Sequence, residues 1–410
     1  MKRIRVGVIG GGASGMMAAI TAAHRGAEVT ILEGGERVGK KLLSTGNGKC
    51  NLGNLEMSEQ YFYGSTPEWL RSALERFPTE ETVRFFGKLG MLVKNKGGYL
   101  YPASEQASTV LDVLRQEVKA LGIRVVTAYK VNEIAPSQNG GQIRVSDGKT
   151  NYSFDRVILA CGGKAAPKTG SDGSGYRLAR RLGHKIVPTV PALVQLKCRE
   201  DYLKAVAGVR CVGEVKALYE GNCVAGERGE IQFTEYGISG IPVFQLSRTV
   251  NYILEEQQEV DVILDLFPDY DEEAYRQLQA DRAHLKTGRT VEEFFTGLLN
   301  KKLMMLFVKL SGLKQQEQAE RADEKALSAV YHLCRHWELH VNGHKSYDNA
   351  QVCAGGVDTA EVTAEMESKI VPKVYFAGEL LDVDGRCGGY NLHWAWCSGY
   401  LAGCAAAEEK

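Results

Sequence analysis

The chain begins with a strand, a glycine-rich turn and a helix, and this unit constrains the fold more than any other segment. Residues 4–9 (IRVGVI) are a β-branched run, and Gly10, Gly12 and Gly15 follow in G-x-G-x-x-G spacing before an alanine-rich helical pattern at 13–25. The first glycine allows a tight turn, the second lets the backbone approach a pyrophosphate, and the third lets the helix pack on the strand. The unpaired N–H groups that start such a helix bind phosphate. We therefore predict an α/β fold with a Rossmann-like nucleotide-binding domain.

An acidic residue completes this unit. Residues 27–32 (AEVTIL) predict a second strand, and Glu33 at its end stands where the diol of a ribose is bound. An acid at this point favours a ribose without a 2′-phosphate, as in FAD or NAD. The glycine spacing alone is a weak signal, and a βαβ unit that binds no nucleotide is the alternative. The strand, turn, helix, second strand and acid together favour a dinucleotide.

The next segment separates FAD from NAD. Residues 37–51 read RVGKKLLSTGNGKCN, a loop rich in lysine and glycine. Such a loop can wrap a long dinucleotide beyond its first phosphate. The alternative is a solvated basic loop, because charge runs usually lie at the surface. We interpret the loop as part of a site for FAD, held non-covalently because no segment carries a covalent attachment signature.

Charge and apolar patterning exclude several other classes of protein. The 410 residues carry 50 Lys plus Arg and 50 Asp plus Glu, so no global field draws the chain toward nucleic acid or an anionic membrane. The start of the chain has no apolar signal core, and no uncharged apolar stretch is long enough to span a bilayer. We expect a cytoplasmic protein with no nucleic-acid or membrane partner, and the oligomeric state stays open. The ten cysteines form no C-x-x-C pair, which indicates reduced, mostly buried thiols.

The remainder of the first part alternates helices and strands. Apolar spacing predicts two helices, at 67–89 and 108–121, and residues 157–163 (VILACGG) predict a buried strand. That strand would end at the carboxyl edge of the parallel sheet, where ligands bind. The loop at 169–175 (TGSDGSG) lacks dinucleotide spacing, and it is either a loop over the first cofactor or a plain turn.

A change of pattern marks an insertion in the middle of the chain. Residues 190–268 hold many short predicted strands separated by turn glycines, and residues 269–345 are mainly helical. We therefore predict an FAD-binding domain built from both chain ends, 1–189 and 346–410. A β-rich, barrel-like domain and a helical segment are inserted between them and would face the substrate.

The C-terminal segment returns to the cofactor in this interpretation. Residues 373–378 (KVYFAG) predict a core strand, the loop 385–390 (GRCGGY) follows, and an apolar helix starts near Asn391. The free N–H groups at 389–392 carry partial positive charge, which would favour negative charge at the N1 and O2 edge of a reduced flavin.

One histidine series repeats every four residues: His332, His336, His340 and His344. On one continuous helix these imidazoles would align for a metal. Residues 338–341 alternate like a strand and Gly343 interrupts the pattern, so the last two histidines should leave the helix. We expect surface histidines and no metal.

Five segments together resemble a known family. They are GGGASGMMAA at 10–19, GKKLLSTGNGKCN at 39–51, GEIQFTEYGISGIPVFQLSR at 229–248, NAQVCAGGV at 349–357 and YFAGELLDVDGRCGGYNLHWAWCSGYLAG at 375–403. They resemble the aminoacetone oxidase and BaiN-type bile-acid oxidoreductase family of FAD-binding proteins. The resemblance covers essentially the whole chain, and GGYNLHWAW is its most specific segment.

The resemblance implies FAD held by both chain ends. The implied contacts are Gly10, Gly12, Ala13, Ser14, Gly15, Glu33, Gly34, Lys40, Lys41, Thr45, Gly46, Asn47, Cys50, Asn51, Gly378, Glu379, Asp384, Gly389, Tyr390 and Asn391. Cys387 and His393 stand where Thr and Gln are expected in relatives, so the substrate can differ from that of either named member. Tyr390, His393 and Cys50 are catalytic candidates: the first two can donate protons and the third is polarizable, but each is equally suited to packing.

Two chemistries fit this family. A reductase would take hydride from NAD(P)H and deliver it to a polarised C=C bond of a small molecule, such as an unsaturated steroid or bile acid. Because no second G-x-G-x-x-G unit is visible, NAD(P)H would dock transiently. An amine oxidase of the aminoacetone type would instead pass electrons to oxygen. We favour the reductase; an RNA-associated flavoprotein, against which the neutral charge argues, and a non-catalytic flavoprotein are alternatives from other classes.

Overall fold

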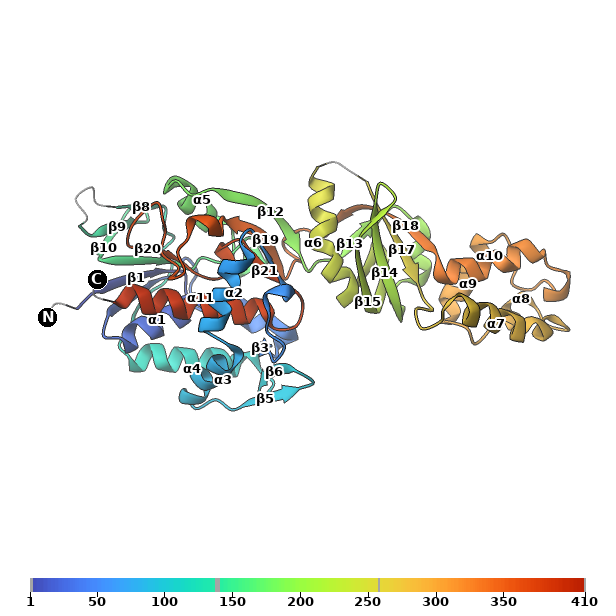
Figure 1. Ribbon diagram of the computed structural model, residues 1–410, viewed down its shortest axis with the longest axis horizontal. Helices are drawn as coiled ribbons and strands as arrows, with labels where there is room; N and C mark the ends of the chain where they lie inside the picture. The colour runs from blue at the N-terminus through green and yellow to red at the C-terminus, as the bar shows by residue number, and fades with distance from the viewer. Residues whose placement is uncertain (1–2, 137–140, 257–258, 409–410) are drawn as a thin grey trace. The chain divides into compact units, whose positions relative to one another are not determined.

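The computed structural model describes residues 3–136, 141–256 and 259–408 (Figure 1). The chain forms two compact units, one made of residues 1–191 with 347–410 and the other of residues 192–346. Both ends of the chain therefore belong to the first unit.

The centre of the first unit is a parallel sheet with strand order β20-β11-β1-β2-β7. Its strands are β1 (Arg5–Ile9), β2 (Glu28–Leu32), β7 (Arg124–Val126), β11 (Arg156–Leu159) and β20 (Val374–Phe376). The central strands are rich in Val, Ile and Leu and are buried, as expected for parallel strands covered on both faces. The C-terminal strand β20 pairs with β11, so the end of the chain completes the sheet that its beginning starts.

Two helices from opposite ends of the chain pack closely together. Helix α1 (Ala13–His24) follows β1, and helix α11 (Tyr390–Ala407) ends the described chain; Figure 1 shows them side by side. A Cβ at Gly399 would lie 2.5 Å from the carbonyl oxygen of Ser14, and one at Gly403 would lie 2.5 Å from that of Ala18. These two glycines of α11 therefore permit a backbone approach that larger residues would prevent.

Smaller elements surround this sheet. The helices are α2 (Pro67–Arg76), α3 (Thr79–Lys88), α4 (Ala107–Ala120) and α5 (Ser174–Arg181). The short strands are β3 (Gly53–Asn54), β4 (Phe62–Gly64), β5 (Val93–Lys96), β6 (Tyr99–Pro102), β8 (Glu133–Ala135), β9 (Ile143–Ser146), β10 (Asn151–Phe154), β12 (Ile186–Ala192), β19 (Val352–Val357) and β21 (Val383–Gly385). The prediction of one helix over 67–89 was wrong, because Pro78 ends the first helical run and caps the second.

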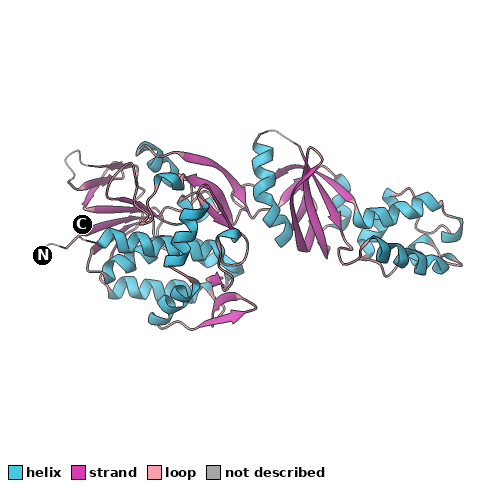
Figure 2. Cartoon of the chain, in the orientation of Figure 1, coloured by secondary structure: helices cyan, strands magenta, loops and turns pink. Residues whose placement is uncertain are grey.

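The second unit combines a barrel with a group of helices, as Figure 2 shows. The barrel closes in the order β13-β16-β15-β14-β17-β18, with β13 (Leu196–Cys198), β14 (Arg210–Tyr219), β15 (Asn222–Thr234), β16 (Gly237–Gly240), β17 (Val260–Asp265) and β18 (Trp337–His344). The helices between β17 and β18 are α7 (Glu272–Arg282), α8 (Val291–Phe295), α9 (Lys301–Leu310) and α10 (Glu324–Arg335). One apolar core, which includes Phe233, Phe307 and Trp337, runs through barrel and helices.

The β-rich region also contains a helix that its sequence pattern did not predict. Helix α6 (Ile241–Glu255) lies between β16 and β17, and Pro242 stands in its first turn. Glycines and β-branched residues around it favoured strands throughout, but a periodic apolar face (Val243, Leu246, Val250) is buried in the core. Histidines 340 and 344 lie on β18, outside α10, as predicted.

The predicted fold class is confirmed by this arrangement of a parallel sheet, a closed barrel and helices. Among the described residues, every helix is too short or too polar to cross a bilayer.

Candidate cofactor and active site

A cavity of about 830 Å³ opens in the first unit at the carboxyl ends of its central strands. Ile9 and Gly10 line it at the end of β1, Glu33 follows β2, and Cys161 lies just beyond β11. Its volume falls in the upper part of the range of about 300–1,000 Å³ typical of ligand pockets. Ligands of open α/β sheets bind at this edge.

The three fingerprint glycines play different structural parts. Gly10 adopts a φ of +100°, and a Cβ there would lie 2.4 Å from the carbonyl oxygen of Ala160. A Cβ at Gly15 would lie 2.0 Å from the carbonyl oxygen of Gly10, so this glycine sets the helix against the turn. At Gly12, which lines the cavity, no atom lies within 4 Å of a Cβ position. Only Gly12 therefore keeps space free for a ligand.

Glu33 is held in place by the backbone. Its Oε2 accepts a hydrogen bond from the N–H of Gly11, and its Oε1 accepts one from the N–H of Gly35, both at 2.7 Å. These contacts leave the remaining lone pairs of the carboxylate for hydroxyl donors in the cavity. Helix α1 has no acidic residue in its first turn, so no carboxylate there competes with an anion for its N-terminal N–H groups.

The basic loop is tied to the cavity and is not simply solvated. Lys40 and Lys41 both line the cavity; Lys40 Nζ donates to the carbonyl oxygen of Lys168 at 2.8 Å, and Lys41 Nζ pairs with Glu379 Oε2 at 2.7 Å. The side chains of Lys41 and Glu379 are 23% and 19% exposed. The pair therefore joins the N-terminal loop to the segment after β20.

The glycine-rich loop at 169–175 lines the same cavity, which favours its interpretation as a loop over the cofactor. Within it, the Asp172 carboxylate pairs with Lys130 Nζ at 2.6 Å. Partial burial would raise the pKa of Asp172, but hydrogen bonds from Lys130 and Ser174 lower that pKa to about 2. This carboxylate therefore stays ionised at neutral pH and anchors the loop to Lys130.

The start of α11 also reaches the cavity. The N–H of His393 donates to the carbonyl oxygen of Gly389, so the three preceding N–H groups have no partner within the helix. Asn391 and Leu392 line the cavity at this point. The Asn391 side chain accepts from the N–H of Gly385 at 2.8 Å and donates to its carbonyl oxygen at 2.6 Å, which fixes the preceding loop.

The three catalytic candidates are all buried. The Tyr390 ring stacks on Tyr61 with centroids 5.0 Å apart, and burial, with Tyr61 and Glu56 nearby, raises its pKa to about 12. Burial raises the pKa of the Cys50 thiol to about 12 as well. The His393 ring is fully enclosed, with Thr82 Oγ1 3.1 Å from Nδ1 and the Phe77 carbonyl oxygen 3.1 Å from Nε2. Burial lowers the pKa of His393 to about 4, so this imidazole is neutral at pH 7.

Comparison with known proteins places the chain in a family. A family model described as the HI0933-like protein Rossmann domain matches residues 4–405. The chain belongs to the HI0933-like family. This confirms the resemblance found in the sequence.

Two curated relatives span nearly the whole HI0933-like chain. The 3-dehydro-bile acid delta(4,6)-reductase of Clostridium scindens is 46% identical over 410 residues, with 99% of each chain covered. The ribosomal RNA dihydrouridine synthase of Haemophilus influenzae is 31% identical over 411 residues, with 98% of each covered. The prediction that this chain is an oxidoreductase is confirmed.

A solved structure is similar in fold. It is the 3-ketosteroid-delta4-(5alpha)-dehydrogenase of Rhodococcus jostii RHA1, with a TM-score of 0.52 and 15% sequence identity, covering 99% of this chain and 97% of that one.

In this HI0933-like chain the predicted cofactor residues divide into two groups. Those that line the cavity are Gly10, Gly12, Ala13, Ser14, Glu33, Gly34, Lys40, Lys41, Thr45, Glu379 and Asn391. Outside its lining lie Gly15, Gly46, Asn47, Cys50, Asn51, Gly378, Asp384, Gly389 and Tyr390. Several of these support the lining. Gly378, for example, accepts from Trp394 Nε1 and donates to Ser398 Oγ.

Two parts of the lining were not predicted from the sequence. The first part, directly after β7, consists of Tyr129, Lys130 and Val131. Their position after a strand of the parallel sheet could have indicated that they line the cavity. Gln351 and Val352 lie in a segment used only for the family resemblance, and no local pattern marks them as cavity residues.

Proposed function

We propose that this chain is an FAD-dependent reductase that saturates a carbon–carbon double bond in a steroid-like substrate, with NAD(P)H as the electron donor. The observation that carries the proposal is the 46% identity to the bile-acid reductase of Clostridium scindens over 99% of both chains. Because the alignment covers nearly all of both chains, neither protein has a domain that the other lacks.

The cavity fits a dinucleotide of the FAD kind. Gly12 leaves open space at the N-terminus of α1, where a pyrophosphate would meet unpaired N–H groups, and Glu33 offers carboxylate oxygens to a ribose. Asn51 Oδ1 is buried and has no hydrogen-bond partner in the described chain, and a Cβ at Gly389 would lie 2.7 Å from it. A bound ring with an N–H donor would satisfy this acceptor. When bound, FAD supplies the hydride transfer.

The residues near the start of α11 would serve the reaction in two ways. The free N–H groups of Asn391 and Leu392 favour negative charge in the adjoining cavity. Saturating a C=C bond also needs a proton, and Tyr390, which lies outside the cavity lining but directly before Asn391, is our proposed donor. We assign His393 a structural role, because both of its ring nitrogens have partners in the core.

An anaerobic experiment tests the proposal. Purified yellow protein is mixed with NADH or NADPH, the loss of flavin colour is followed, and a 3-oxo-4,6-diene steroid is then added. We expect bleaching by one of the two donors and recovery of colour on adding the steroid. Bleaching by an amine such as aminoacetone, with recovery only in oxygen, would support the oxidase instead. Flavin that no donor reduces would support a non-catalytic flavoprotein.

A second candidate function follows from a specific observation. The relative in Haemophilus influenzae, a ribosomal RNA dihydrouridine synthase, is 31% identical over 98% of this chain. The reduction of a uracil base is chemically close to the reduction of a steroid-like substrate, because both reactions saturate a conjugated C=C bond. The neutral net charge argues against RNA, which proteins bind mainly through clustered basic residues. Recovery of flavin colour with unmodified ribosomal RNA and none with the steroid would favour this second function.

A further inference from the structure

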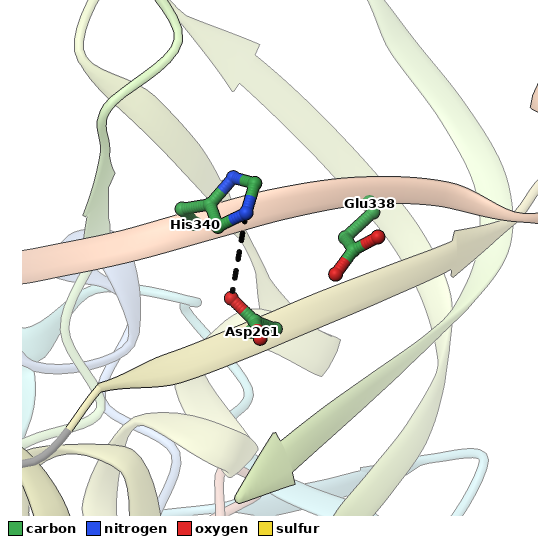
Figure 3. A group of neighbouring side chains, drawn as sticks. All are labelled: Asp261, Glu338 and His340. Carbon is green, nitrogen blue, oxygen red and sulfur yellow. Dashed lines mark ion pairs between the residues drawn. The ribbon is translucent and has the colours of Figure 1, made fainter. Parts of the chain in front are cut away.

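Three side chains with metal-ligating atoms meet on the barrel wall of the second unit: Asp261 on β17, and Glu338 and His340 on β18 (Figure 3). Asp261 stands directly opposite His340 in the antiparallel pairing of the two strands. Glu338 comes two residues before His340, so all three side chains project from the same face of the sheet. One ligating atom from each lies within 4.8 Å of the other two.

The spacing of these atoms suits an ion between them. His340 Nε2 and Asp261 Oδ1 are 3.9 Å apart, which is too long for a direct hydrogen bond. Around a tetrahedral zinc ion with ligands at about 2.1 Å, neighbouring ligand atoms lie about 3.4 Å apart. The side chains of Asp261 and His340 are 40% and 50% exposed, so they can move until the two atoms reach the distance that zinc ligands need.

Glu200 provides an independent sign of a ligand. Its side chain is only 9% exposed, and its Oε1 lies 2.7 Å from His340 Nδ1 and accepts from the His340 N–H at 3.0 Å. Its Oε2 is buried and has no hydrogen-bond partner among the described residues. Metal-binding histidines typically give the proton of one ring nitrogen to a carboxylate in this way, which leaves the other nitrogen to bind the metal. Glu200 thus directs His340 Nε2 toward Asp261.

The local charge is predominantly negative. Glu200, Asp261 and Glu338 bring three carboxylates around one imidazole. The nearby guanidinium of Arg199 is engaged by Glu259. A divalent cation would offset this excess of negative charge, part of which is buried.

We propose that Asp261, Glu338 and His340 bind a divalent transition-metal ion, best matched by zinc, and that Glu200 positions His340 for it. One imidazole and two carboxylates form a three-ligand set that zinc accepts, with water completing the coordination. The proposal is independent of the function proposed above, since none of these residues lines the cofactor cavity.

A competing pair of imidazoles must be tested beside this site. His332 and His336, at the end of α10, stack with ring centroids 4.7 Å apart and an interplanar angle of 8°. Because two imidazoles stand side by side here, this pair is the alternative place for zinc to bind. The double variant His332→Gln/His336→Gln is therefore the matched control for His340→Gln.

The test is a zinc titration of the full-length, flavin-loaded protein after dialysis against a chelator, with a chromophoric chelator as competitor. We expect one strong equivalent in the parent and in the His332→Gln/His336→Gln control, and none in His340→Gln. Glu200→Gln keeps all three ligands but should weaken zinc binding about 10- to 100-fold. Asp261→Asn serves as a second ligand variant, and circular dichroism and flavin content report whether each variant is folded.

Three results would overturn the proposal. The first is no strong binding by the parent protein, and the second is binding unchanged in folded His340→Gln and Asp261→Asn. The third is loss of binding only in the His332→Gln/His336→Gln control, which would assign the zinc to α10.

Discussion

The two ends of the cofactor cavity are built in different ways. At the N-terminal end, Gly12, Gly15 and Glu33 act through backbone geometry inside one continuous βαβ unit. At the other end, Lys41 pairs with Glu379 across most of the chain, and the start of α11 follows a loop held by Asn391. The first end is a local structure, whereas the second exists only once the chain ends have met.

This difference predicts different responses to mutation. A change in the βαβ unit meets either fixed backbone atoms or the space kept for the cofactor, and should act in an all-or-none way. A change at the C-terminal end removes one side-chain contact among several, so its effect should be graded. The predictions below test this contrast, from the largest expected effect to the smallest.

Gly15→Val should prevent folding of the first unit. Its Cβ would lie 2.0 Å from the carbonyl oxygen of Gly10, a backbone atom that cannot move without displacing β1. Overpacking of a core typically costs about 1–3 kcal/mol, and a clash with backbone should exceed that range. Soluble yield and circular dichroism measure the effect. A soluble, normally folded and yellow Gly15→Val protein would show that the helix and turn are not locked together.

Gly12→Val carries the same substitution three residues earlier and should leave the fold intact while abolishing FAD loading. No atom lies within 4 Å of a Cβ at this position, and its φ of −79° suits any residue, so the side chain meets only the space of the cavity. Flavin absorbance per chain and the thermal midpoint of the apoprotein separate the two effects. Normal flavin content in Gly12→Val would contradict the placement of the pyrophosphate.

His393→Gln should make the protein less sensitive to acid. Burial lowers the pKa of His393 from 6.5 to about 4, so the unfolded chain takes up a proton below pH 6.5 before the folded chain does. Folding stability is therefore full above pH 6.5 and is lost as the pH falls toward 4, by about 3 kcal/mol at 1.36 kcal/mol per pKa unit. The unfolding free energy of parent and variant, measured across this window, should diverge by that amount.

The same variant tests the role of this residue in the reaction. Turnover at pH 7 should be retained in His393→Gln, because the ring has no access to the cavity. Loss of turnover in a folded, flavin-loaded variant would restore His393 as a proton donor.

Lys41→Met and Glu379→Gln should each weaken FAD binding by about 1 kcal/mol, the smallest effect in this set. Both side chains line the cavity, and Glu379 Oε1 also accepts from the N–H of Cys353 at 2.7 Å, so part of its anchoring survives either change. The double variant should lose less than the sum, because contacting residues couple by about 0.5–3 kcal/mol. FAD dissociation constants of the four proteins measure the coupling, and strict additivity would mean that the pair is not maintained in solution.

The errors in sequence-based prediction have physical causes. Helix α6 was missed because glycines and β-branched residues around it favour strands, while its apolar face is recognised only against the barrel core it covers. The helix break at Pro78 follows from the missing N–H of proline, but continuous apolar spacing masked it. The catalytic candidates Tyr390 and His393 stay predictions: they were chosen by residue type, which says nothing of burial, and the structure buries both side chains.

The sequence by itself determined the βαβ unit and the glycines that its turn requires, and it predicted Glu33 as the ribose acid. These follow from contacts within one segment, where spacing along the chain equals position in space. Only the tertiary structure decided the Lys41–Glu379 pair, the buried Asn51 oxygen and the meeting of Asp261 with His340. Their partners are distant in sequence, and strand register and helix packing, which local periodicity does not encode, bring them together.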